Sequence, residues 1–263
     1  MTRLVTFDLD GVLYRDTELT PHVIEVTEAL RARGIRLTFL TNNSARNRGE
    51  VAERLRLLGI TASASEVVTS GHTTALYLAR CPAPGPIYVI GERGLRDELL
   101  EQGLRLTEEA SQARIVVVGW DRDLTYTKLA AAHSAICNGA TFVATNGDVS
   151  YPVSGGATVP GAGASVAALS ASTGAAPLVI GKPAPTGLAM IGEAYDVGPA
   201  EMAAVGDRLD TDIAAANAFG CRSILVLTGI STREEAESAE GLLRPQAVIE
   251  DLSYLPSALG LDA

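Results

Sequence analysis

Short apolar runs alternate with longer helical patterns along almost the whole chain. Runs at residues 4–7, 37–40, 203–205 and 223–227 carry no charge and end in small or polar residues, which is typical of buried strands. Helical patterns occupy residues 21–33, 44–58, 185–195 and 209–219, and Gly34 and Gly59 follow the first two, where a helix C-cap favours glycine. This alternation predicts an α/β fold, in which helices cover both faces of a mostly parallel sheet.

The middle of the chain carries a second set of the same signals. Strands are expected at 87–90, 115–118 and 141–143, and helices at 93–102 and 125–137. Residues 79–86, with three prolines and a glycine, predict a connection, and the Gly- and Pro-rich residues 152–163 predict a loop. We therefore expect a Rossmann-like core at 1–79 and 179–263, interrupted by an inserted α/β domain at 80–178.

Composition narrows the class of protein. The 263 residues include 21 Lys and Arg against 31 Asp and Glu, so the net charge of −10 disfavours nucleic acid or an anionic membrane as a partner. The three cysteines lie far apart and predict no disulfide framework. Prolines interrupt the longest uncharged run, residues 149–181, and acids arrive by position 8, so we expect neither a membrane span nor an export signal. A cytoplasmic protein is expected.

The first candidate for chemistry is the sequence Asp8-Leu9-Asp10-Gly11, at the end of the first predicted strand. Residues two apart in a strand face the same side, so both carboxylates are expected to point to one place. Two such acids repel each other unless a cation or a shared proton lies between them. A solvated turn with accidental acids is the alternative interpretation.

Three further clusters follow predicted strands. Thr41-Asn42-Asn43-Ser44 offers a hydroxyl, amides and main-chain N–H groups that suit an anion, although Asn43 or Ser44 is also an ordinary helix N-cap. Gly181-Lys182-Pro183 offers an ammonium group for phosphate, with a plain surface lysine as the alternative. Asp207 and Asp212 fall at a strand end and in the next helix, where acids also stabilise the helix dipole.

The spacing combines these weak signals. Thr41 lies 33 positions after Asp8 and Asp207 lies 25 positions after Lys182, and each interval fits one helix and one strand. The 141 positions between Thr41 and Lys182 fit an inserted domain. Carboxyl ends of parallel strands are where such sheets bind ligands, so the clusters are expected at one edge. Carboxylates with a phosphate-binding lysine favour a phosphate ligand with Mg²⁺.

In order and spacing, the four clusters resemble the four motifs of the haloacid dehalogenase superfamily. The insertion between the second and third motifs is similar to that of members with a large α/β cap. The sequences around Asp8, Thr41, Asn146, Lys182 and Asp207 resemble the NagD-like branch, which includes p-nitrophenyl phosphatases and phosphoglycolate phosphatases. The resemblance covers nearly the whole chain and implies a phosphatase for a small phosphorylated metabolite. Cap-mediated homodimers occur in this branch, so a homodimer through the cap is an expectation by analogy.

The resemblance also implies a role for each motif residue. Asp8 is the expected nucleophile and forms an aspartyl-phosphate, while Asp10 acts as the general acid and base. Phosphate contacts are expected from Thr41, Asn42, Asn43 and Lys182. Mg²⁺ is expected on Asp8, on Asp10 through its main-chain carbonyl and on Asp207, and Asp212 is expected to orient the metal's waters or Lys182.

Three other functions compete with this interpretation. A non-catalytic phosphate-binding protein on the same fold is disfavoured because it has no need of a nucleophile. A phosphotransferase or mutase is disfavoured because mutase-like relatives usually carry the cap between the first two motifs. A dinucleotide enzyme is disfavoured because Gly161-x-Gly163 lacks the third glycine of the fingerprint. The physiological substrate is left open.

Overall fold

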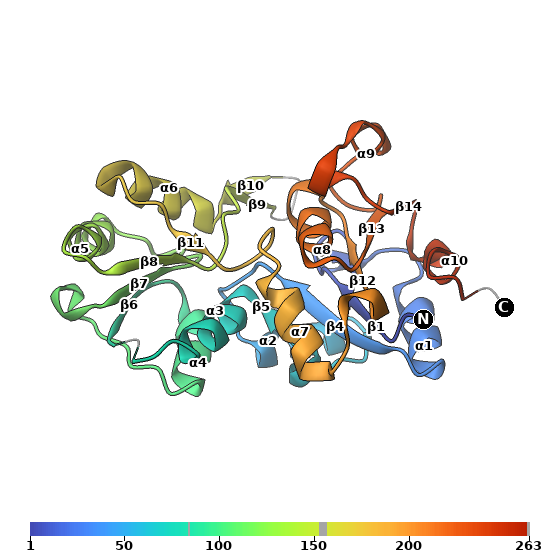
Figure 1. Ribbon diagram of the computed structural model, residues 1–263, viewed down its shortest axis with the longest axis horizontal. Helices are drawn as coiled ribbons and strands as arrows, with labels where there is room; N and C mark the ends of the chain where they lie inside the picture. Colours follow the sequence, from blue (N-terminus) through green and yellow to red (C-terminus); the bar gives the residue numbers. More distant parts are fainter. Residues whose placement is uncertain (84, 153–156, 262–263) are drawn as a thin grey trace. The chain divides into compact units, whose positions relative to one another are not determined.

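The computed structural model describes residues 1–83, 85–152 and 157–261, and its contacts group the chain into two compact units. The first unit contains residues 1–41, 51–68 and 182–263, and the second contains residues 42–50 and 69–181. Each unit is built on a sheet covered by helices (Figure 1), so the predicted α/β class is confirmed. The second unit adds 42–50, 69–79 and 179–181 to the inserted residues, and the boundaries 80–178 stay a prediction.

The first unit is organised around a six-stranded sheet. Its strands, in spatial order, are β14 (Ala247–Ile249), β13 (Arg222–Val226), β12 (Met202–Gly206), β1 (Leu4–Phe7), β4 (Arg36–Thr41) and β5 (Val67–Thr69). The five strands from β14 to β4 are parallel. Phe7 pairs with Val205 on one side and Phe39 on the other. The carboxyl ends of β12, β1 and β4 therefore lie at the same edge of the sheet.

Side chains that alternate along these strands build two apolar layers. Val5 and Phe7 belong to the layer under α1 (Val23–Ala32), α2 (Arg48–Leu57) and α10 (Leu255–Ala258). Leu4 and Ala204 belong to the layer under α7 (Thr186–Tyr195) and α8 (Ala214–Phe219). Uncharged, buried strands between two helix layers are the arrangement that the apolar runs predict. The unit also holds the short strands β2 (Tyr14–Arg15) and β3 (Glu18–Leu19), and α9 (Arg233–Ser238).

The second unit repeats this design on a smaller scale. Its parallel sheet has the order β11 (Leu178–Val179), β8 (Thr141–Ala144), β7 (Ile115–Val118) and β6 (Ile87–Ile90). Tyr88 and Ile90 pack with α5 (Tyr126–Cys137) and α6 (Ala162–Thr173). Ile87 and Val89 pack with α3 (Ser70–Ala79) and α4 (Arg93–Glu101), so two helices cover each face (Figure 1). A small antiparallel pair, β9 (Ser150–Pro152) and β10 (Thr158–Pro160), completes it.

The structure corrects several expected elements. The helix predicted from residue 44 begins at Arg48, because Asn47 and not Asn43 or Ser44 caps it. The Asn47 side chain accepts from the Glu50 N–H at 2.9 Å, and the Asn47 N–H donates to the Glu50 carboxylate at 3.1 Å. The loop predicted at 152–163 includes β10 and the start of α6, while its residues 153–156 lie outside the described part.

Several described elements have no counterpart among the expected ones, among them β5, α3 and α6. The helices α3 and α6 consist largely of small and uncharged residues, so they lack the polar face that marks an amphipathic helix. Within the described residues, none of the helices combines the length and apolar character that a membrane crossing requires.

Candidate active site

The first unit gathers predicted functional residues at the carboxyl edge of its sheet. Asp8 directly follows β1, Asp207 directly follows β12, and Thr41 is the last residue of β4. Because these three strands are adjacent, parallel and in register, the three side chains emerge next to one another. Gly11 and Gly206 have no side chain, so the neighbouring carboxylates can occupy the space beside them at this edge of the sheet.

Lys182 is the cation of this cluster. Its Nζ donates to Asp8 Oδ1 and to Asp212 Oδ1, each at 2.5 Å, and to the main-chain carbonyl of Leu40 at 3.2 Å. Only 7% of the Lys182 side chain is exposed. The alternative of a surface lysine is therefore wrong, and the ammonium group is held at the sheet edge by two carboxylates.

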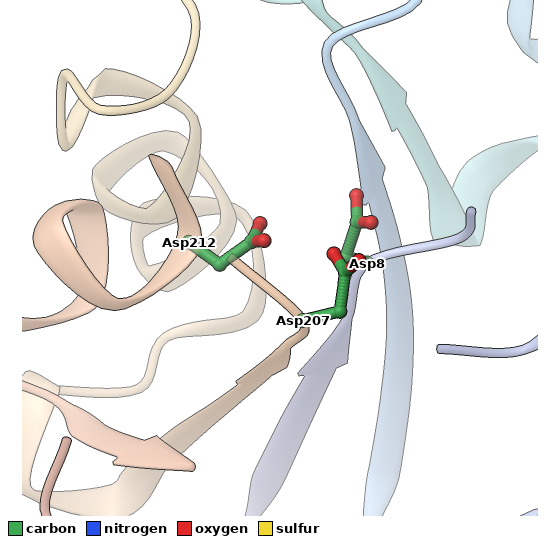
Figure 2. Close-up of side chains that lie close together, drawn as sticks. All are labelled: Asp8, Asp207 and Asp212. Carbon is green, nitrogen blue, oxygen red and sulfur yellow. The ribbon is translucent and has the colours of Figure 1, made fainter. Parts of the chain in front are cut away.

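The carboxylates of Asp8, Asp207 and Asp212 lie close to one another (Figure 2). Asp8, Asp207 and Asp212 each offer an oxygen, and these oxygens lie within 4.8 Å of one another. They come from the ends of β1 and β12 and from a wide π-helical turn, Leu209–Ile213. One lysine offsets only part of the charge of three carboxylates, and clustered carboxylate oxygens are the hard ligands that divalent cations such as Mg²⁺ prefer.

Asp207 is fixed by the loop that follows β13. The Ile230 N–H donates to Asp207 Oδ2 at 2.9 Å, and the Ser231 N–H donates to the Asp207 main-chain carbonyl at 3.0 Å. A Cβ on Gly229 would overlap the Asp207 carboxylate, and so would one on Gly11, whose φ is +83°. Both positions therefore require glycine, one of them for its backbone conformation as well.

Burial and crowding shift the pKa values of these groups. Burial raises the pKa of Asp8 well above its ordinary value, against the attraction of Lys182 and with added repulsion from Asp212 and Asp207. Burial and the charge of Asp212 raise the pKa of Asp207 to about 7. Burial lowers the pKa of Lys182, but the charges of Asp212 and Asp8 outweigh it and the net shift is upward. Lys182 is therefore cationic at neutral pH.

Asp10 lies on the tight turn that leads from β1 into β2. The Leu9 carbonyl accepts the main-chain N–H groups of Leu13 at 2.9 Å and Val12 at 3.3 Å, which closes this turn. The Thr228 hydroxyl donates to the Gly11 carbonyl at 2.7 Å and so ties the turn to the loop after β13. Among the described residues, the cluster of neighbouring carboxylates contains Asp8, Asp207 and Asp212 but not Asp10.

The predicted phosphate-binding segment is divided between the units, since Thr41 belongs to the first and Asn42 to the second. Within the second unit, the Asn42 amide donates to both carboxylate oxygens of Asp148, at 3.2 and 3.1 Å. The Asn43 amide donates to the Tyr151 hydroxyl at 3.3 Å. Both side chains therefore donate hydrogen bonds within the second unit. We expect this segment to offer its main-chain N–H groups to an anion.

Other contacts of this segment were not evident in the sequence. The main-chain carbonyl of Asn42 accepts from the Ser70 hydroxyl at 2.6 Å and from the Asn146 amide at 2.7 Å. The Ser44 hydroxyl accepts from the Trp120 N–H at 3.1 Å. These partners are 28 to 104 positions away in the chain, so no local pattern points to them. Gly229, two positions after the run at 223–227, is a local signal that could have indicated the loop that holds Asp207.

Comparisons with known proteins agree with this geometry. Residues 5–105 match the family model described as haloacid dehalogenase-like hydrolase, and residues 179–255 match a related hydrolase-like model. The chain is 37% identical to 5′-nucleotidase YutF of Bacillus subtilis over 94% of each protein. The structure is similar to 4-nitrophenylphosphatase from Thermotoga maritima, with 36% identity, a TM-score of 0.91, and coverage of 98% of this chain and 97% of that one.

A third similar protein is the glycerol phosphate phosphatase from Mycobacterium tuberculosis, solved in complex with magnesium. The identity is 37% and the TM-score 0.91, over 97% of this chain and 77% of that one. The fold and these matches define a phosphatase, an enzyme of the class that hydrolyses phosphoric monoesters. The chain belongs to the haloacid dehalogenase-like hydrolase family, and the resemblance to the branch that contains the p-nitrophenyl phosphatases is confirmed.

Proposed function

We propose that this protein is a Mg²⁺-dependent phosphatase that releases phosphate from a small phosphorylated metabolite through an aspartyl-phosphate on Asp8. The observation that carries the proposal is the position of the Lys182 ammonium group, held at 2.5 Å by both Asp8 and Asp212 beside the carboxylate of Asp207. A nucleophilic carboxylate, an ammonium group and further carboxylates are the groups that phosphoryl transfer requires in one place.

In this proposal, Lys182, the Thr41 hydroxyl and the main-chain N–H groups of Asn42 and Asn43 hold the phosphoryl oxygens. Lys182 is suited to this role because it stays charged while buried, and a buried charge interacts strongly with a phosphate dianion. Thr41 is buried at the end of β4, the strand next to β1. These donors are set before the reaction and stabilise the charge that spreads over the transferred group.

The chemical step begins when a carboxylate oxygen of Asp8 attacks phosphorus. A new P–O bond forms to Asp8, the ester P–O bond breaks, and the leaving oxygen takes a proton from Asp10. Asp10 then accepts a proton from water as that water attacks the phosphorus of the aspartyl-phosphate. This second step returns Asp8 as a carboxylate, releases inorganic phosphate and restores the proton on Asp10.

The residues present fit a magnesium site. We assign the metal to a carboxylate oxygen of Asp8, the main-chain carbonyl of Asp10 and the carboxylate of Asp207. Asp212 is assigned to orienting Lys182 or the metal's waters, and its 2.5 Å contact with Lys182 supports the first of these roles. When bound, Mg²⁺ supplies positive charge that offsets the repulsion between the Asp8 carboxylate and the phosphate dianion.

The remaining expectations are part of the same proposal. Residues 80–178 are assigned as the cap that selects the leaving group, as the family resemblance implies. The substrate class is a small phosphorylated metabolite, in keeping with the phosphatases that resemble this chain. A homodimer through the cap stays a prediction.

The test is hydrolysis of p-nitrophenyl phosphate by the purified protein, with Mg²⁺, with EDTA, and by an Asp8→Ala variant. We expect turnover that requires both Mg²⁺ and Asp8, and the Asp8→Ala variant is expected to bind phosphate analogues without turnover. If a broad panel of phosphomonoesters gives no hydrolysis with folded, Mg²⁺-supplied protein, the catalytic proposal is wrong. Phosphate binding without turnover by the wild type would instead support a non-catalytic binding protein.

A further inference from the structure

A second candidate binding site lies in the second unit, at the amino-terminal edge of its sheet. A pocket of about 530 Å³ is lined by the residues that begin or precede all four strands, among them Pro86, Arg114, Thr141 and Leu178. Trp120 and Asn146 follow the carboxyl ends of β7 and β8 and therefore lie at the opposite edge of this sheet. The volume falls within the range of about 300–1,000 Å³ that is usual for small-molecule sites.

Two arginines line this pocket from neighbouring segments. The Arg105 carbonyl accepts from the Ile87 N–H at 2.9 Å, and the Arg114 N–H donates to the Pro86 carbonyl at 2.8 Å. The two residues therefore lie on either side of the first residue of β6. The aliphatic part of Arg114 lies against Gly85, where a Cβ would approach the Arg114 Cγ to 2.7 Å.

The charges of these arginines are not balanced nearby. In residues 1–83, 85–152 and 157–261, neither guanidinium group has an ion pair or a side-chain hydrogen bond, and none of the residues lining the pocket is acidic. By contrast, Arg96 and Arg122 of the same unit are paired with Glu108 and Glu92. Both arginines are exposed, so their guanidinium groups are accessible to an anion that enters the pocket.

The inner wall of the pocket is apolar. Leu78, Ile115 and Val143 contribute buried side chains, and Leu178 leaves 43% of its surface exposed at the rim. An apolar part of a ligand that covers Leu178 and this wall removes apolar surface from water, which is favourable. Guanidinium groups bind carboxylate and phosphate oxygens through paired, charge-assisted hydrogen bonds. Exposed arginines beside buried apolar side chains fit a ligand with an anionic group and an apolar body.

We propose that this pocket is a second, non-catalytic binding site for a small organic anion, with a carboxylate or phosphate group on an apolar body. The anionic group pairs with Arg105 and Arg114, and the apolar body lies on Leu78, Ile115 and Val143. All of the lining residues belong to the second unit, so the site is independent of Asp8, Lys182 and the proposed reaction.

Cys81 offers a local reporter, because it lines the pocket and is partly exposed. Cys137 is exposed elsewhere, and Cys221 is buried with a thiol pKa raised by burial to about 12. Alkylation by iodoacetamide, followed by peptide mass spectrometry, measures each thiol separately. We expect octanoate or octylphosphonate at ten times its Kd to slow alkylation of Cys81 about tenfold and to leave Cys137 unchanged. Comparison of the two probes identifies the preferred anionic group.

Variants locate the interaction. Arg105→Gln with Arg114→Gln removes both charges, and Arg93→Gln removes a charge from an arginine that is 80% exposed on the same unit. Calorimetry is expected to show octanoate or octylphosphonate binding weakened about tenfold or more by the double variant and unchanged by Arg93→Gln. Acetate and octanol, which carry only one of the two recognised features, are expected to bind more weakly than octanoate.

Two results would overturn the proposal. One is the lack of measurable heat and of Cys81 protection with either probe in the wild type. The other is equal binding by wild type and double variant, when circular dichroism shows that both are folded. Hydrolysis of p-nitrophenyl phosphate is expected to be the same in the wild type and double variant, so failure of this site is distinguishable from failure of the catalytic proposal.

Discussion

The two units share one architecture but carry different side chains at the carboxyl edges of their sheets. In both, parallel strands with alternating apolar side chains lie between two layers of helices. The carboxyl edge of the first sheet carries Asp8, Asp207 and Lys182, which are ionisable and largely buried. The carboxyl edge of the second carries Trp120 and Asn146, which are neutral and hydrogen-bonded to the segment after Thr41, and the buried Asp121, which is paired with Lys128. The comparison shows that a cluster of three carboxylates around one lysine, and not the fold, distinguishes the candidate catalytic edge from the other.

The comparison also explains how the charges are tolerated. Buried ions are costly unless they are paired, and the first unit supplies Lys182 to two carboxylates and the Ile230 main-chain N–H to the third. The second unit has its own buried acid, Glu98. Burial raises the pKa of Glu98, but hydrogen bonds from His72 and the Arg48 N–H outweigh it, and the net shift is downward. Glu98 is therefore ionised and stabilises the fold. The pKa values of Asp8 and Asp207 are instead raised, so a bound cation would favour their ionised forms.

The substitution expected to reduce activity most at the candidate catalytic edge is Lys182→Met. The substitution removes the ammonium group from between Asp8 and Asp212, so phosphate loses its buried positive partner and the carboxylates repel each other. We expect kcat to fall by about a thousandfold or more. Steady-state kinetics with p-nitrophenyl phosphate measures the effect. Lys128→Met is the matched control, because Lys128 pairs with Asp121 within the second unit, and its activity is expected to stay within twofold or so. Equal losses in the two variants would contradict the proposed role of Lys182.

Gly229→Ala tests how the Asp207 carboxylate is positioned. The added methyl group would overlap that carboxylate, so Asp207 must move from the place where the Ile230 N–H holds it. We expect Mg²⁺ affinity, measured by calorimetry, to fall about tenfold or more. Gly198→Ala is the control, because no atom lies within 4 Å of the position of its Cβ. Unchanged affinity in Gly229→Ala would show that the loop after β13 does not position the metal ligand.

The pH dependence of stability distinguishes the two kinds of buried acid. The pKa of Asp207 is raised from 3.8 to about 7, and that of Asp8 is also raised. Between these values the metal-free folded protein holds protons that the unfolded chain has lost, so its unfolding free energy falls as pH rises from about 4 to about 7. Thermal unfolding with EDTA measures this fall.

Two controls accompany the pH measurement. Mg²⁺ is expected to raise the Tm more at pH 8 than at pH 5, because the cation replaces the protons lost by Asp207 and Asp8. Asp207→Asn removes one of the titrating groups and is expected to flatten the profile of the metal-free protein. A metal-free Tm that rises over this pH range would contradict the assigned pKa directions.

The smallest expected effect belongs to the second unit. Tyr151→Phe removes the hydroxyl that accepts from the Asn43 amide at 3.3 Å, a neutral hydrogen bond worth about 1 kcal/mol. We expect KM for p-nitrophenyl phosphate to change about fivefold or less, with Mg²⁺ affinity unchanged. Calorimetry and steady-state kinetics on the same preparation separate the two quantities. A loss of activity as large as that of Lys182→Met would contradict the smaller role proposed for the second unit.

The sequence by itself determined the fold class and predicted which residues gather at the candidate catalytic edge. The apolar runs that predict β1, β4, β12 and β13 form the sheet, because a strand buried on both faces must be apolar along its length. The ends of β1 and β12 could then be placed together, since parallel strands carry their carboxyl ends to one edge. Asp8 and Asp207 were therefore identifiable without coordinates.

Only the tertiary structure decided how those residues are held. The burial of Lys182 between Asp8 and Asp212 depends on groups 174 and 30 positions away, and a local pattern does not encode such distances. The local cap between Asn47 and Glu50 sets the start of α2 at Arg48, whereas the Ser44 hydroxyl accepts from the main-chain N–H of Trp120, 76 positions away. The pocket between Arg105 and Arg114 arises because strand pairing places distant segments side by side. Periodicity fixes which side chains share a face, whereas their partners are fixed by packing between elements.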